Sequence, residues 1–171
     1  IQTYGGRQFW ASDPKPADFH VSDIAHSLSL LCRFNGHCRE FYSVAEHSVR
    51  VSRAVPAEHA LAALLHDAAE AYFSDVPRPV KDQLDGLRRM EDDLLEVIFG
   101  QLGAPWPLHP AVKAADDRLL ATELRDLMEP LPEDPPWLPL DEAIEPWSAQ
   151  QAEAAFLARF AELSRGRAST W

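Results

Sequence analysis

An apolar run at residues 60–65, followed at once by His66 and Asp67, constrains the fold of this chain more than any other feature. The run contains only alanine and leucine, which favour helix, so we predict a helix over about 57–72. A helix that is apolar on all sides belongs at the centre of a fold. The end of this helix then places an imidazole beside a carboxylate in the interior, where an unpaired charge is very unfavourable. A divalent metal ion is the commonest partner for such a pair.

The remainder of the chain also predicts helices. Ser43 is the expected N-cap of one helix, and Pro110 is the expected first residue of another. The β-branched residues are few and scattered, so no strand is expected. The fold class is therefore predicted as all-α, a single bundle of about six helices over residues 24–34, 44–55, 57–72, 80–102, 110–128 and 148–163.

A length of 171 residues predicts one domain with three parts. Residues 1–22 are polar and rich in turns, and form an N-terminal segment that wraps over the domain. Residues 23–128 form the core. Residues 129–171 form a proline-rich loop and a C-terminal helix packed on the core, and the acidic, proline-rich composition of 129–146 predicts a mobile surface segment.

The charge of the chain limits its partners. The net charge is −11, with 27 acidic and 16 basic residues, which argues against duplex nucleic acid. A small phosphate ester stays open as a partner, because a metal ion and a few local cations reverse the sign inside a cleft. No membrane association is expected, since no run approaches the roughly 18–20 apolar residues of a spanning helix. Assembly into a homo-oligomer, as a dimer or larger, is also compatible with the sequence.

The location predicted from the sequence is the cytoplasm. The first residues lack the apolar core of a signal peptide. Cys32 and Cys38 are interpreted as free thiols of a reducing compartment, because two cysteines in a chain with a large core do not form a disulfide framework. Zinc ligation by this pair is the less favoured alternative.

Two further predicted helices each contribute a ligand residue. His47 lies in the helix that follows Ser43, and Asp116 lies in the helix that follows Pro110. The order His, His-Asp, Asp on three helices predicts one metal centre, with His47, His66, Asp67 and Asp116 as ligands. Asp117 is a rival to Asp116 for the last position.

Glu70 follows His66 by four residues and Asp67 by three. On a helix these spacings put the three side chains on one face. Glu70 is therefore expected to lie close to the metal without binding it, which is the place for a group that orients or deprotonates water. The alternative is a solvated helix carboxylate.

Four motifs together resemble the HD-domain metal-dependent phosphohydrolases, and most closely their bacterial and phage-type 5'-deoxyribonucleotidase branch. The resemblance covers about residues 24–128 and implies an HD-domain helical bundle with one divalent metal ion: manganese, cobalt, zinc, iron or magnesium. A binuclear site needs extra histidines, and only His109 lies between the His-Asp pair and the last Asp. The motifs are Val44-Ala45-Glu46-His47-Ser48, His66-Asp67-Ala68-Ala69-Glu70, Asp75-Val76-Pro77 with Pro79-Val80-Lys81, and Val112-Lys113-Ala114-Ala115-Asp116.

The resemblance also implies roles for single residues. By it, His47, His66, Asp67 and Asp116 hold the metal, and Glu70 activates or positions the water. Six residues are implied in substrate binding. Arg33 would bind the phosphate, Phe34 would pack against the sugar or the base, and Asp75 would accept a hydrogen bond from the 3'-hydroxyl. Lys81 and Arg78 would be secondary phosphate contacts, and His37 would lie near the mouth of the cleft.

Some of these roles have alternatives. The family usually has a tryptophan at the position of Phe34, so only modest discrimination between deoxyribose and ribose is expected. Arg78 and Lys81 are alternatively solvated surface charges, and His37 is alternatively a loop histidine.

The resulting expectation is a phosphohydrolase that releases phosphate from deoxyribonucleoside 5'-monophosphates. One alternative is a triphosphohydrolase that releases triphosphate from deoxynucleoside triphosphates. Another is a module that binds a nucleotide as a sensor without turnover. A purely structural zinc domain is the least favoured, because its site is closed by four protein ligands and needs no neighbouring base.

Overall fold

The computed structural model describes residues 1–10, 13–130, 132–133 and 135–165. Over this part of the chain the secondary structure is helical, and β pairing is confined to two isolated bridges, Gln2 with Gln8 and Cys32 with Ser43. The all-α prediction is confirmed.

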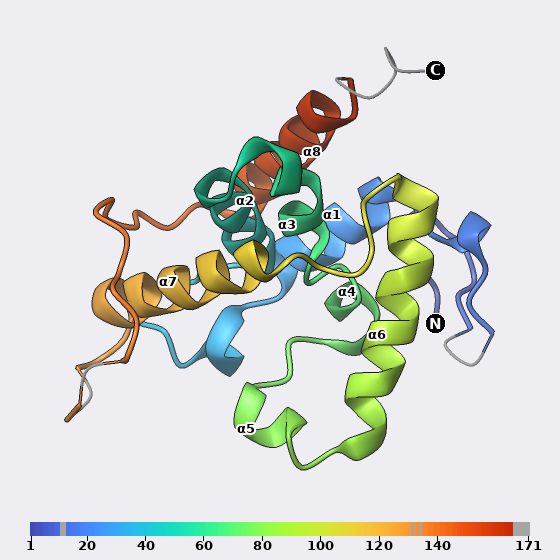
Figure 1. Ribbon diagram of the computed structural model, residues 1–171. Coiled ribbons are helices and arrows are strands. Elements are labelled where there is room, and N and C mark those ends of the chain that lie inside the picture. Colours follow the sequence, from blue (N-terminus) through green and yellow to red (C-terminus); the bar gives the residue numbers. More distant parts are fainter. Residues whose placement is uncertain (11–12, 131, 134, 166–171) are drawn as a thin grey trace.

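Eight α-helical segments lie within the described residues (Figure 1), and two of them, α4 and α5, are single turns. Three short 3₁₀ turns also lie within the described residues: one precedes α1, and the other two lie before and after α2. The helices are α1 (Val21–Leu30), α2 (Val44–Ala54), α3 (Ala60–Leu65), α4 (Glu70–Phe73), α5 (Arg78–Lys81), α6 (Asp85–Leu102), α7 (Pro110–Leu127) and α8 (Ala149–Arg165), and the 3₁₀ turns are η1 (Pro16–Asp18), η2 (Arg33–Gly36) and η3 (Ala57–His59).

The core is built around α2 and α3. Helix α2 packs against α1, α3, α7 and α8, and α3 also packs against α8. Every residue of α3 is buried, as its alanine and leucine run predicts. On α8, Phe156 is fully buried, and Leu157 and Phe160 pack against the same cluster. The expected packing of the C-terminal helix on the core is confirmed.

Several predicted helix ends are correct. The Ser43 side chain accepts a hydrogen bond of 3.1 Å from the Glu46 N–H and so caps α2. Helix α7 begins at Pro110. The predicted helix over 80–102 instead begins at Asp85, because Leu84 has a non-helical backbone conformation and the residues before it form the separate turn α5.

The predicted helix over 24–34 is shifted. It begins at Val21, after the extended residue His20, and the carboxylate of Asp23 in its first turn binds Gly5 and Arg7 of the N-terminal segment. It ends at Leu30, because the following turn, η2, has φ values of 55° at Phe34 and 49° at Asn35. A bulky side chain in this left-handed region is uncommon and marks a constrained loop.

The sulfur atoms of Cys32 and Cys38 lie 3.6 Å apart at the two ends of this loop, and both cysteines are free. The prediction of free thiols is confirmed.

Within the loop between α7 and α8, for which we expect mobility, residues 140–144 are hydrogen-bonded to α7. Side chains of α7 bind its backbone: the Leu140 N–H donates to the Thr122 hydroxyl, Arg125 donates to the carbonyl oxygens of Leu140 and Glu142, and the Ile144 N–H donates to Asp126. Composition alone did not reveal these contacts. Residues 131, 134 and 166–171 of the predicted loop and tail lie outside the described residues.

None of the helices in the described ranges is long and apolar enough to cross a membrane.

Candidate metal centre

The single helix predicted over 57–72 is interrupted at the His-Asp pair. Helix α3 ends at Leu65 and α4 begins at Glu70. Between them the backbone bonds join residues three apart, such as the Glu70 N–H to the Asp67 carbonyl oxygen at 3.0 Å and the Ala68 N–H to that of Leu65 at 2.9 Å. In such a tightened turn the side chains of residues i and i+3 lie above one another, so Asp67 and Glu70 face the same side.

Three of the predicted ligand residues converge on one point. His66 Nε2 lies 3.3 Å from His47 Nε2 and 3.2 Å from Asp67 Oδ2, and His47 Nε2 lies 3.6 Å from the same oxygen. One ligand atom from each residue falls within 4.8 Å of the other two. This cluster of His47, His66 and Asp67 can hold a metal ion.

Asp116 joins the cluster from α7. Its Oδ1 lies 3.3 Å from His47 Nε2. Lys113 and Arg78 contact the carboxylates of both Asp116 and Asp117, but of these two carboxylates it is that of Asp116 that also contacts His47. The geometry therefore favours Asp116 over Asp117 as the fourth ligand.

The outer nitrogens of both imidazoles are already engaged. His66 Nδ1 lies 2.8 Å from the carbonyl oxygen of Ala63, and His47 Nδ1 lies 2.6 Å from Glu123 Oε1. Both oxygens accept hydrogen bonds, so Nδ1 of each ring is the protonated nitrogen. In two neutral rings the lone pairs of both Nε2 atoms would then point toward each other, which a cation between them would relieve.

Glu123 was not found from the sequence. Its side chain is fully buried on α7, and Oε2 lies 3.0 Å from Arg33 NH2 while Oε1 binds His47. Glu123 follows Asp116 by seven residues and Leu119 by four, so it belongs to the same buried helix face. A glutamate in register with Asp116 and Leu119 was the clue that the sequence offered.

The carboxylates of Glu123 and Asp116 favour the protonated form of His47. Burial and the nearby Arg33 disfavour the imidazolium, but Glu123 and Asp116 outweigh them and raise the pKa of His47 to about 9. Burial alone would raise the pKa of Asp116, yet the hydrogen bond and the positive charge of His47 hold it far below its usual range. Without metal, a proton on His47 therefore takes the place of the cation.

Metal binding is expected to displace this proton. The folded-state pKa of His47, about 9, exceeds its ordinary value of 6.5. The stability that this proton gives the metal-free protein is thus fully present below pH 6.5 and is lost as pH rises through 9. The affinity for manganese should rise about tenfold per pH unit over the same interval and level off above it. Calorimetric titrations in buffers of different ionisation enthalpy measure both affinity and released protons; an affinity independent of pH would contradict this prediction.

A cavity of about 460 Å³ opens beside the centre. Asp67, Glu70 and Asp116 line it, so the ligand cluster and the proposed water-activating carboxylate share one space. Five of the six predicted substrate contacts also line it: Arg33, Phe34, Asp75, Arg78 and Lys81.

Two residues differ from the expected lining. His37 is exposed and is not among the lining residues. Arg88, which we did not single out from the sequence, is among them.

Glu70 is only 7% exposed, and its Oε2 has no hydrogen-bond partner among the described atoms. Burial, and next the negative charges of Asp67 and Asp75, raise the pKa of Glu70 well above its usual value, while Lys81 opposes the shift. A carboxylate shifted in this direction is better suited to accept a proton near neutral pH.

The guanidinium of Arg33 forms ion pairs with carboxylates of the protein. Besides its contact with Glu123, NH1 lies 3.9 Å from Asp67 Oδ2, and the guanidinium lies 5.3 Å from the centre of the Phe34 ring. Its Nε is buried without a hydrogen-bond partner among the described atoms. Burial would lower the pKa of Arg33, but Glu123 and Asp67 raise it further above its already high value.

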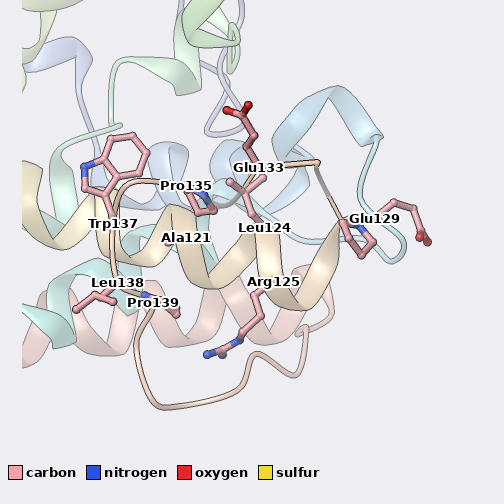
Figure 2. Close-up of a pocket in the computed structure, with 10 residues that line it drawn as sticks. Ala121, Leu124, Arg125, Glu129, Glu133, Pro135, Trp137, Leu138 and Pro139 are labelled. Atoms are coloured by element: carbon pink, nitrogen blue, oxygen red, sulfur yellow. The ribbon is translucent and has the colours of Figure 1, made fainter.

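A second cavity, of about 430 Å³, lies between α7 and the following loop (Figure 2). Pro135, Trp137 and Leu138 of the loop line it together with Leu124 of α7. It contains no member of the ligand cluster, and Leu124 is the lining residue that it shares with the first cavity.

No protein-family model matches the chain. The chain is 46% identical over 127 residues to YfdR of Escherichia coli (strain K12), an uncharacterized protein, and the match covers 74% of this chain and 71% of YfdR. It is 39% identical over 125 residues to an uncharacterized protein of Rhodobacter capsulatus, and that match covers 65% of this chain and 64% of the relative.

Proposed function

The chain belongs to the same family as YfdR of Escherichia coli, and from its own residues we propose that it is a metal-dependent phosphohydrolase of the HD-domain kind that acts on nucleotides. One observation carries this proposal: a buried carboxylate, Glu70, lines the same cavity as the ligand residues Asp67 and Asp116. A structural metal site needs no open cavity and no neighbouring base, whereas a hydrolytic site needs both.

The donor set fits a transition metal. His47 and His66 offer imidazole nitrogens, and Asp67 and Asp116 offer carboxylate oxygens. Such a mixed set suits manganese, cobalt, zinc or iron better than magnesium, which prefers oxygen ligands. When bound, the metal supplies polarisation of a phosphoryl oxygen and a lowered pKa of water.

The remaining steps belong to residues of the cavity. Glu70 takes a proton from the attacking water or holds that water in line with the phosphorus. Arg33 lines the cavity, and its guanidinium offsets charge that develops on the phosphoryl oxygens. Asp75 accepts a hydrogen bond from a sugar hydroxyl, and Phe34 packs against the sugar or the base.

The charges of the cavity favour one phosphate group over three. Each of its four cationic side chains is already paired: Arg33 with Glu123, Arg78 with Asp116 and Asp117, Lys81 with Glu70 and Glu91, and Arg88 with Asp82. A triphosphate brings more negative charge than these paired cations readily neutralise. We therefore propose deoxyribonucleoside 5'-monophosphates as substrates and phosphate as the product.

A nucleotide panel tests the function. The protein is loaded with manganese or cobalt and incubated with deoxyadenosine and adenosine 5'-monophosphates and with deoxyadenosine triphosphate, and the products are separated by chromatography. Phosphate from a monophosphate is the expected result, and the chelator-treated protein is the control. Triphosphate from the triphosphate would indicate the triphosphohydrolase, and nucleotide binding without hydrolysis would indicate the sensor.

Replacing Glu70 with glutamine should separate chemistry from binding. The amide keeps the shape of the side chain but accepts protons poorly, so turnover should fall by about 10²-fold or more while metal content and substrate binding persist. Glu58→Gln, at an exposed carboxylate on η3, is the matched control. Near-normal turnover of Glu70→Gln would show that Glu70 does not handle the proton.

A further inference from the structure

Lys81 lies between two buried carboxylates that belong to different helices. Its Nζ lies 3.0 Å from Glu91 Oε1 on α6 and 3.6 Å from Glu70 Oε1 on α4. Lys81 itself is the last residue of α5. Glu91 is therefore the closer of the two carboxylates to the ammonium group, and it contacts that group as an ion pair.

Glu91 occupies an unusual place on its helix. It is 7% exposed and lies on the face that also buries Leu94, Leu95 and Ile98, whereas the neighbouring acidic residues Asp92, Asp93 and Glu96 are exposed. An apolar residue would fill this position without a desolvation penalty. Among the described residues, Lys81 is the only cation paired with Glu91.

Glu91 and Glu70 share the ammonium group of Lys81. A lysine side chain is long and flexible, and an ammonium group released from one carboxylate moves to the next. Held by Glu91, Lys81 keeps only a long contact with one oxygen of Glu70, and the other oxygen, Oε2, has no hydrogen-bond partner. Without Glu91, Lys81 is expected to form a close ion pair with Glu70 and to turn that carboxylate away from its working position.

We propose that Glu91 is a positioning residue that acts through Lys81 to hold Glu70 in the orientation needed for its reaction with water. The inference rests on the proposed phosphohydrolase function. It also gives Lys81 a different role from the secondary phosphate contact that the sequence suggested.

The kinetic test uses the full chain loaded with manganese and the nucleotide that it hydrolyses fastest. Glu91→Leu should lower kcat about 10-fold, with KM changed by less than about 2-fold, because the displaced group acts on the reacting water rather than on substrate binding. Metal content should match that of the parent, and the urea midpoint should fall only slightly, because Lys81 loses one carboxylate partner but keeps Glu70 as the other. Glu96→Leu, at an exposed carboxylate of the same helix, is the control.

A double-mutant cycle shows whether Glu91 acts through Lys81. In a Lys81→Met background, adding Glu91→Leu should cause no further loss of kcat, because the link is already broken. An unchanged kcat in Glu91→Leu, or losses that multiply in the double variant, would overturn the proposal.

A crystal structure of Glu91→Leu separates this inference from the function on which it rests. Lys81 Nζ should lie closer to Glu70 Oε1 than the 3.6 Å of the parent, whether or not any nucleotide is hydrolysed. An unmoved Lys81 refutes the positioning role even if the protein is a phosphohydrolase. A parent protein that hydrolyses no nucleotide refutes the function and leaves the positional result to be judged on the structure.

Discussion

Replacing Glu123 with alanine should lower the free energy of unfolding by about 3–5 kcal/mol, because the change leaves two buried cationic groups without their carboxylate. Arg33 loses its 3.0 Å partner, and the imidazolium of His47 loses its 2.6 Å partner. The same change should weaken metal binding by roughly 10- to 100-fold, since Glu123 fixes the orientation of the His47 ring.

Urea denaturation with and without manganese, together with metal titration, measures both effects. Glu123→Gln should lie between the parent and the alanine variant, because the amide oxygen still accepts from His47 Nδ1–H but carries no charge. Glu129→Ala, at a carboxylate 82% exposed just beyond α7, should match the parent. A parental urea midpoint in Glu123→Ala would mean that the buried carboxylate does not stabilise the fold.

Replacing Asp67 with alanine should abolish both metal binding and turnover. Asp67 Oδ2 lies within 3.6 Å of the Nε2 atoms of His47 and His66, so its loss removes a carboxylate that contacts both rings. Elemental analysis after dialysis against manganese gives the metal content, and the nucleotide panel gives the turnover.

Asp117→Ala provides the matched control for this experiment. Asp117 is adjacent to Asp116 in sequence and shares its contacts with Lys113 and Arg78, but Asp116 alone of the two contacts His47 among the described residues, so the Asp117 variant should retain full metal occupancy. Full occupancy in Asp67→Ala would remove that residue from the ligand set.

The sequence was sufficient to predict the central element and the residues that meet there. A helix over 60–65 that is apolar on all sides has to lie at the centre of a small helical fold, and His66 and Asp67 follow directly after it. The structure buries this helix as expected. The interruption after Leu65 was not predictable from propensity, because Ala68 and Ala69 favour a continuous helix. Tertiary contacts of the turn decide its conformation there.

Residues whose partners lie far away in sequence were the hardest to find. Glu123 looks like one more helix carboxylate until the fold brings Arg33 and His47 to it. The same holds for the loop between α7 and α8, whose prolines and acidic residues suggested mobility. Arg125 and Asp126 bind its backbone only once the chain has turned back along α7.

The contact between His47 and Glu123 spans 76 residues, and that between Arg33 and Glu123 spans 90. Contacts of such sequence separation form late in folding, because a long loop must close before they stabilise anything. During synthesis the amino-terminal helices emerge first, so His47, His66 and Asp67 meet the solvent before α7 exists. In a newly made chain these three side chains therefore stay hydrated until residue 123 has left the ribosome and α7 packs against α2.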